Sequence, residues 1–75
     1  MNHDHKIYRY EFIGLDGSIV HSEESSFAQT PHELHLSAQI GLSNVNARVI
    51  ATRYVVRDSQ TAEIIVSSDD WINET

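Results

Sequence analysis

Residues 30–42 read TPHELHLSAQIGL, and this segment decides the fold because it combines two incompatible signals. Its opening predicts a helix start, since the Thr30 hydroxyl can accept from the backbone of Glu33 while the Glu33 carboxylate accepts from Thr30. Pro31 suits the first helical position, where its missing N–H group would have no partner in any case. The apolar residues instead recur at every second position, which is the period of a strand: Leu34, Leu36, Ala38, Ile40 and Leu42.

We interpret the segment as a helix from Pro31 to about Ile40, because a second signal marks its end. Gly41 suits a left-handed residue just past a helix, and Leu42 is placed to fold back onto the last turn. The residues between the two signals are weak strand formers, and a segment of this length is normal for a helix. As a strand, the same segment would give the alternative fold, a small all-β five-stranded barrel.

Residues 6–24 predict a β-hairpin before this helix. An Asp-Gly pair lies between two strand-like stretches and supplies the two positive φ angles of a type I′ turn. With a two-residue loop, Arg9 lies opposite Glu24, and Ile13 lies opposite Val20. The first of these is an opposite-charge cross-strand pair, which supports this register.

Residues 45–68 predict a second hairpin, because both of its stretches are rich in β-branched residues. A polar loop, Asp58–Thr61, separates the two stretches, so that Arg57 lies opposite Ala62. In the acidic tail that follows, we expect an aspartate to cap a short final turn and Trp71 to dock on the domain.

The predicted elements follow one another as strand, strand, helix, strand, strand. This ββαββ order predicts an α+β fold, in which a four-stranded antiparallel sheet has one helix packed on one face. We expect the 75 residues to form a single small domain, with residues 1–5 disordered.

The composition disfavours several functional classes. Eleven acidic residues against five basic ones give a net charge of -6, which repels the phosphate backbones of nucleic acids. No stretch reaches the ~18 consecutive apolar residues of a membrane span, and the first residues lack the apolar core of a signal peptide. The chain has no cysteine, so it can form neither a disulfide nor a thiolate metal site. We therefore expect a soluble, acidic, cytoplasmic protein that binds no nucleic acid and no membrane.

No motif for catalysis or cofactor binding is present, so we expect no cofactor and favour a protein that is not an enzyme. The chain has no thiol nucleophile, no Gly-x-Ser-x-Gly elbow and no phosphate-binding glycine loop. His32 and His35 are spaced to share a zinc or nickel ion on one helix face, but two ligands are too few. His3 next to a free amino terminus matches a loose pattern for copper or nickel. These histidines are weak metal candidates only.

Both predicted hairpins have apolar residues on both faces, whereas one helix can cover only one face of the sheet. A second copy of the chain could cover the remaining face, and a symmetric dimer is the commonest closed assembly. We therefore predict a homodimer formed through the sheet. The expected function is a non-enzymatic protein-interaction module that binds a second copy or another protein. Its expected interface or binding residues are mainly aromatic: Tyr8, Tyr10, Phe12, Arg53, Tyr54 and Trp71.

Two alternatives belong to other functional classes. A small-ligand or metal-binding domain would use a pocket between helix and sheet, and its polar candidates are His21, His32, His35, Arg53 and Tyr54. An acidic decoy of nucleic acid would need its acidic residues gathered on one surface, whereas here they occur mostly singly or in pairs along the chain.

Overall fold

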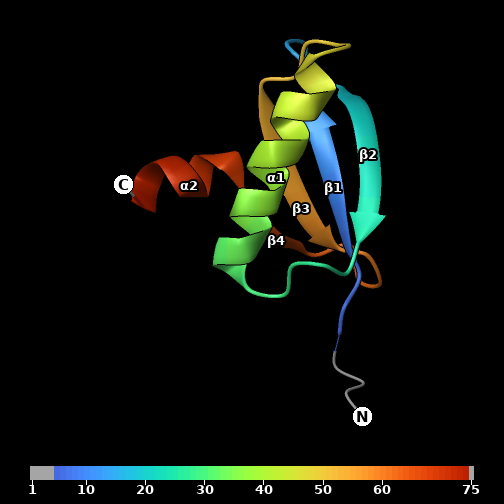
Figure 1. The fold of residues 1–75 in the computed structure, drawn as a ribbon, viewed down its shortest axis with the longest axis vertical. Coiled ribbons are helices and arrows are strands. Elements are labelled where there is room, and N and C mark those ends of the chain that lie inside the picture. Colours follow the sequence, from blue (N-terminus) through green and yellow to red (C-terminus); the bar gives the residue numbers. More distant parts are fainter. Residues whose placement is uncertain (1–4, 75) are drawn as a thin grey trace.

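Helix α1 packs on one face of a four-stranded antiparallel sheet with strand order β2-β1-β3-β4 (Figure 1). The structure, a computed structural model, describes residues 5–74, and residues 1–4 of the segment predicted to be disordered lie outside them. The α+β fold is as predicted, and because the sheet is open, the alternative barrel is wrong. The elements are β1 (Tyr8–Ile13), β2 (Ile19–Ser25), α1 (Pro31–Asn46), β3 (Arg53–Asp58), β4 (Ile64–Ser67) and α2 (Ser68–Glu74).

The start of α1 is the predicted capping box. The Glu33 backbone nitrogen donates to the Thr30 hydroxyl over 3.2 Å, and the Thr30 nitrogen donates to a Glu33 carboxylate oxygen over 3.2 Å. Pro31 occupies the first turn, as expected. The two reciprocal bonds satisfy donors that the helix itself leaves free, which is why a helix forms here despite the alternating apolar pattern.

The predicted helix end near Ile40 is wrong, because α1 continues through Gly41 to Asn46. A Cβ atom added at Gly41 would lie 2.7 Å from Cζ of Phe12, and the Phe12 side chain is fully buried. The glycine therefore allows close packing of the helix on β1 and does not act as a stop signal.

The predicted strand from residue 45 is also wrong, since β3 begins only at Arg53. The side chain of Asn46 forms two hydrogen bonds of 2.8 Å to the backbone of Ala51, one to its nitrogen and one to its oxygen. These bonds hold residues 47–50 in a turn between α1 and β3, although this segment is rich in strand-forming residues.

The first hairpin has the predicted register over most of its length, including the pairing of Arg9 with Glu24. Near the turn the register shifts, so that Ile13 pairs with Ile19 and the predicted pairing with Val20 is wrong. Gly17 has a φ of 86°, and no non-glycine residue of this turn has a positive φ. A type I′ turn needs two such residues, so the chain instead forms a longer turn with a bulge.

The second hairpin has a wider loop than predicted. Arg57 pairs with Ile64, so the predicted pairing with Ala62 is wrong. The Asp58 carboxylate accepts from the backbone nitrogens of Gln60 and Thr61, at 2.8 and 3.1 Å. Ala62 adopts a φ of 67°, which a residue with a side chain rarely does, and the sequence gives no sign of it.

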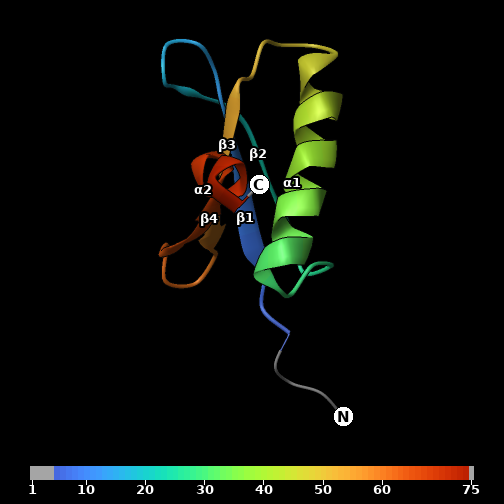
Figure 2. The ribbon, with the colours of Figure 1, turned by 90° about the vertical axis from the view of Figure 1, so that its left-hand side faces the viewer.

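The hydrophobic core lies between α1 and the sheet (Figure 2). Alternate residues of each strand face the helix, as the period of a strand requires. The largest buried contributors are four aromatic residues of β1 and β3 and the aliphatic residues that pack on them: Tyr8, Tyr10, Phe12, Tyr54, Val56, Val66, Leu34 and Val45.

Ion pairs occupy much of the second face of the sheet, which is the face that points away from α1. Arg57 Nε lies 2.9 Å from a carboxylate oxygen of Glu11, which is buried. Arg9 Nη2 lies 3.1 Å from Glu24 Oε2, and the Ser59 hydroxyl donates to the same oxygen. The aromatic residues are on the other face, under α1. The second face therefore has less need of a covering layer than the sequence suggested.

Candidate functional site

The structure separates the predicted interface residues into three places. Four of the six, the aromatic residues of β1 and β3, are buried beneath α1, so in this conformation a partner cannot reach them: Tyr8, Tyr10, Phe12 and Tyr54. Arg53 is exposed at the start of β3, whereas Trp71 is half-buried on α2. The aromatic residues thus belong mainly to the core, and any interaction surface must use other residues.

Trp71 packs against two histidines of α1. Its ring centroid lies 4.9 Å from that of His35 and 5.6 Å from that of His32. His35 is only 1 % exposed, and its Nδ1 atom lies 2.8 Å from the Tyr54 hydroxyl. This cluster attaches α2 to the core.

Within residues 5–74, the histidines do not belong to a group that could form a metal centre. The part of the chain that the structure describes has no group of three or more residues able to hold a metal ion. His3 lies outside that part. His35 is bound to Tyr54, which explains its burial without a ligand.

Strand β2 forms one edge of the sheet, and it is the more accessible edge. Residues Ile19–Glu24 are exposed on both faces. Helix α1 packs mainly on β1, β3 and β4, so β2 lies beside the helix, as Figure 1 shows. The opposite edge strand, β4, is shorter and leads directly into α2.

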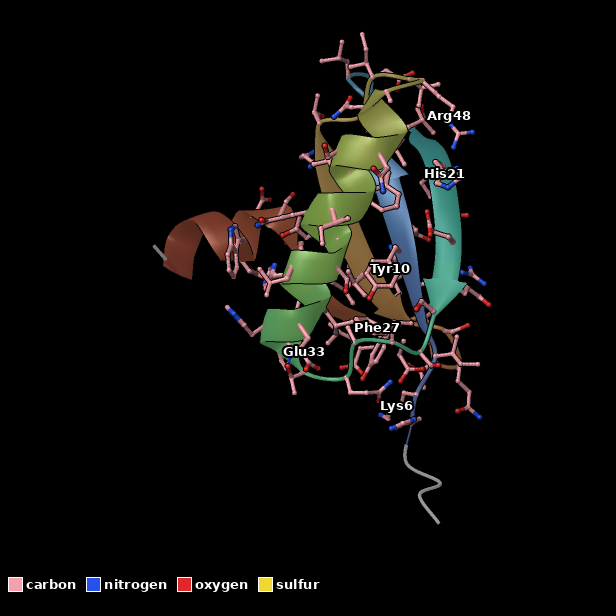
Figure 3. The ribbon with its side chains drawn as sticks, in the orientation of Figure 1. Lys6, Tyr10, His21, Phe27, Glu33 and Arg48 are labelled. Carbon is pink, nitrogen blue, oxygen red and sulfur yellow. The ribbon has the colours of Figure 1, made fainter. Side chains whose placement is uncertain are left out.

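Two cavities lie along the boundary between α1 and β2. The first has a volume of about 130 Å³, and we name it the Tyr10 cavity. It is lined by Tyr10, Phe12, Glu23, Ser25, Phe27, Ser37 and Gly41. The second has a volume of about 120 Å³, and we name it the His21 cavity. It is lined by Val20, His21, Val45, Arg48 and Val49, and Figure 3 places His21 and Arg48 at the end of the molecule away from Phe27.

The hydroxyl of Tyr10 is buried and has no hydrogen-bond partner. Burial raises the pKa of Tyr10; the nearby Ser37 hydroxyl on α1 lowers it by less, and the charge of Glu23 raises it further. Glu23 and Ser37 line the Tyr10 cavity together with Tyr10, but the Tyr10 hydroxyl oxygen itself is buried.

No family model, curated protein or solved structure matches this chain. The function must therefore be inferred from its own geometry. Neither α1 nor α2, the helices within residues 5–74, has the length and apolar character needed to cross a bilayer.

Sequence reasoning missed most of the residues that line the Tyr10 cavity. Tyr10 was predicted as an interface aromatic, whereas Glu23, Ser25 and Ser37 were not singled out. These residues come from β2 and α1, and only the packing of those two elements brings them together. One signal was available in the sequence: Phe27 is a lone aromatic in a short polar segment, and it is 88 % exposed.

Proposed function

We propose that this chain is a protein-interaction module that forms a homodimer by pairing strand β2 with β2 of a second copy. The observation that supports this most is the exposed edge, since residues Ile19–Glu24 are open to solvent on both faces. A long unprotected edge strand is a template for pairing with another strand. Antiparallel pairing of two identical strands about a two-fold axis is self-complementary.

Charge disfavours one register of such a pair and permits another. The two-fold axis is perpendicular to the sheet, so residues that face α1 lie opposite residues that face α1 in the second copy. The His21 Nε2 atom lies 3.1 Å from Glu23 Oε2 of its own strand. An axis through Ser22 also places His21 opposite Glu23 of the second copy, and the same pairing occurs twice. An axis through Glu23 instead places two carboxylates opposite each other, which is destabilising.

Exposed apolar residues at the ends of β2 also favour this register. Phe27 follows β2, and in this register it lies opposite Gly17 of the second copy, two residues before the start of β2 at Ile19. Ile19 and Val20 are exposed there. The dimer would therefore cover apolar surface at both ends in addition to pairing backbone groups.

A charge-swap series tests the interface. His21→Glu places carboxylates opposite each other, and we expect dimerisation to weaken about tenfold. Adding Glu23→Lys to that variant places opposite charges at these two positions and is expected to restore the dimer. Sedimentation equilibrium at about 10 and about 500 µM measures the mass of each variant.

The matched control is Ser43→Glu, which makes the same change in charge at an exposed position of α1. It is expected to leave the dissociation constant unchanged. A wild-type chain that stays monomeric at the higher concentration contradicts the proposal. A dimer that tolerates His21→Glu contradicts the β2 interface.

We place the protein in the cytoplasm. A small extracellular domain usually needs disulfides, and this chain has no cysteine. Fractionation of cells that produce the protein tests this, and recovery of the protein outside the cytoplasmic fraction would contradict it.

A further inference from the structure

Exposed aliphatic side chains gather at one end of the molecule, where the turn between β1 and β2 meets the turn between α1 and β3 (Figure 1 and Figure 2). Gly14 lies between the two turns: a Cβ atom added to it would be 3.0 Å from Cγ1 of Val20 and 3.4 Å from the Ile50 carbonyl oxygen. An exposed apolar patch of this kind marks a surface that binds a protein or a membrane. We name this end the apolar tip, and its exposed apolar residues are Leu15, Ile19, Val20, Val49 and Ile50.

Arg48 and Arg53 flank the apolar tip, and neither has an acidic partner among the residues that the structure describes. The lysine and the other two arginines of the chain each form an ion pair. Arg48 is exposed and lines the His21 cavity, on the side of α1. Arg53 is exposed and precedes the buried Tyr54 in β3, so it lies on the sheet face that points away from α1. The apolar tip therefore has an unpaired positive charge on each side.

Acidic side chains are sparse at the apolar tip, although the whole chain has a net charge of -6. Asp16 is the only acidic residue in the two turns, residues 14–18 and 47–52. Its carboxylate accepts from the nitrogen and the hydroxyl of Ser18, at 3.0 and 2.7 Å. Salt screens exposed charges that lie more than about 10 Å away, so the acidic residues elsewhere have little effect here. The surface that meets a partner is thus apolar and net positive.

The size, chemistry and charge of the apolar tip favour a lipid bilayer over a second globular protein. A stable protein interface uses about 20–30 residues on each side, whereas the tip offers five apolar side chains on two projecting turns. All five are aliphatic, whereas the cores of protein interfaces are enriched in aromatic residues. The cytoplasmic leaflet of a membrane contains anionic lipids, which attract arginine side chains close to the surface.

From this arrangement we infer that the apolar tip docks the chain on the surface of a membrane that contains anionic lipids. The aliphatic side chains enter the boundary between headgroups and acyl chains, and Arg48 and Arg53 bind lipid phosphates on either side. Docking of this kind needs no spanning helix. The expectation of no membrane binding came from the total charge and the lack of a long apolar run, and neither describes this end of the molecule. One copy supplies every group, so the inference does not rest on the proposed dimer.

Co-sedimentation with sucrose-loaded vesicles tests the docking, and the lipid concentration that binds half of the protein measures its strength. The vesicles contain phosphatidylcholine with about 30 % phosphatidylserine, which supplies the anionic headgroups. In about 0.1 M salt we expect the wild-type chain to bind these vesicles. We expect binding to phosphatidylcholine alone to be at least about tenfold weaker, because the two arginines then have no anionic surface.

Two matched pairs of variants test the residues. Ile50→Ser removes a tip side chain that is 62 % exposed, and we expect binding to weaken about tenfold because less apolar surface leaves water. Ile50 lies outside β2, so this variant leaves the proposed dimer interface unchanged. Its control is Ile40→Ser on the outer side of α1, where the side chain is 65 % exposed, and it should bind as the wild type does.

The second pair tests the charge. Arg53→Gln is expected to weaken binding to the anionic vesicles about fivefold. Its control is Lys6→Gln, which makes the same change in charge at the opposite end of the molecule and should bind as the wild type does (Figure 3).

The inference is overturned if the chain does not bind the anionic vesicles, or if it binds phosphatidylcholine alone as tightly. It is also overturned if either variant at the tip binds as its control does. A protein partner is tested with an amphipathic helical peptide that has leucines on one face and glutamates on the other. Saturable NMR shifts of the Leu15 and Ile50 amides at micromolar peptide would assign the tip to a protein partner and overturn the membrane as its occupant.

Discussion

At the scale of single residues, the Tyr10 hydroxyl predicts a gain in stability on its removal. Tyr10→Phe takes away a buried group that has no hydrogen-bond partner while keeping the ring in the core. We expect the free energy of unfolding to rise by about 1 kcal/mol. Urea denaturation of both proteins measures the difference.

Tyr54→Phe is the matched control, and we expect the opposite sign. The Tyr54 hydroxyl lies 2.8 Å from His35 Nδ1, and both residues are buried. Its removal leaves a buried ring nitrogen without this partner, which costs about 1–3 kcal/mol. If Tyr10→Phe destabilises the chain as much as Tyr54→Phe does, the Tyr10 hydroxyl is not unsatisfied.

Gly41 gives a second prediction at this scale. In an exposed helix, Gly→Ala adds about 1 kcal/mol of stability. Here the new Cβ atom would lie 2.7 Å from Cζ of Phe12, a ring with no exposed surface. Overpacking of this kind costs about 1–3 kcal/mol, so we expect Gly41→Ala to be less stable than the wild type by about 1 kcal/mol.

Thermal denaturation measures this effect, and Ser43→Ala, at an exposed position of the same helix, provides the control. That variant is expected to gain a few tenths of a kcal/mol from helix propensity alone. A stabilised Gly41→Ala protein would show that Phe12 moves aside easily.

At the scale of elements, the sequence predicts features that depend on neighbouring residues, but not those that depend on contacts with another element. The start of α1 depends on Thr30, Pro31 and Glu33, which are neighbours in sequence, and it was predicted correctly. The end of α1 depends on Phe12 in another element and on the bonds from Asn46 to Ala51. No local pattern contains that information, so the end was placed too early.

The turn between β3 and β4 predicts a loss of stability in acid. The backbone nitrogens of Gln60 and Thr61 lower the pKa of the Asp58 carboxyl, and Lys6 lowers it further. A carboxyl group whose pKa is lower in the folded state stabilises the fold above its unfolded pKa, about 3.9, and that contribution is lost as the pH falls through the folded pKa. We therefore expect stability to decrease as the pH falls below about 5.

Asp58→Asn tests the cause of this decrease. Its amide oxygen can still accept from the turn but cannot titrate. Urea denaturation from about pH 6 to about pH 2 should show a shallower pH dependence for the variant. Some dependence will remain, because the pKa values of Asp16, Glu24 and Glu33 are also lowered by hydrogen bonds. An unchanged slope would exclude Asp58 as a contributor.

At the scale of the whole molecule, the order of elements was predictable because each hairpin and the helix has its own pattern. The Tyr10 cavity was not, since Ser37 comes from α1 and Glu23 from β2. The ion pairs on the sheet face that points away from α1 were only partly predictable from the sequence. Arg9 with Glu24 was predicted, but the pairing of Arg57 with Glu11 requires β3 to lie beside β1.

Self-association through β2 makes stability depend on concentration. A second copy that binds the folded chain and not the unfolded chain raises the melting temperature as the protein concentration increases. We expect a rise of several degrees for the wild type between about 10 and about 500 µM, and a smaller rise for His21→Glu. Calorimetry measures both, and equal melting temperatures at all concentrations would count against the dimer.

Trp71 is the one tryptophan of the chain, and it packs on α2 against His32 and His35. Its fluorescence therefore comes from a single, known place. A helix as short as α2 is not stable without such contacts. Release of α2 would move the indole from its half-buried position into water and shift its emission to the red, so this end of the chain has a built-in optical probe.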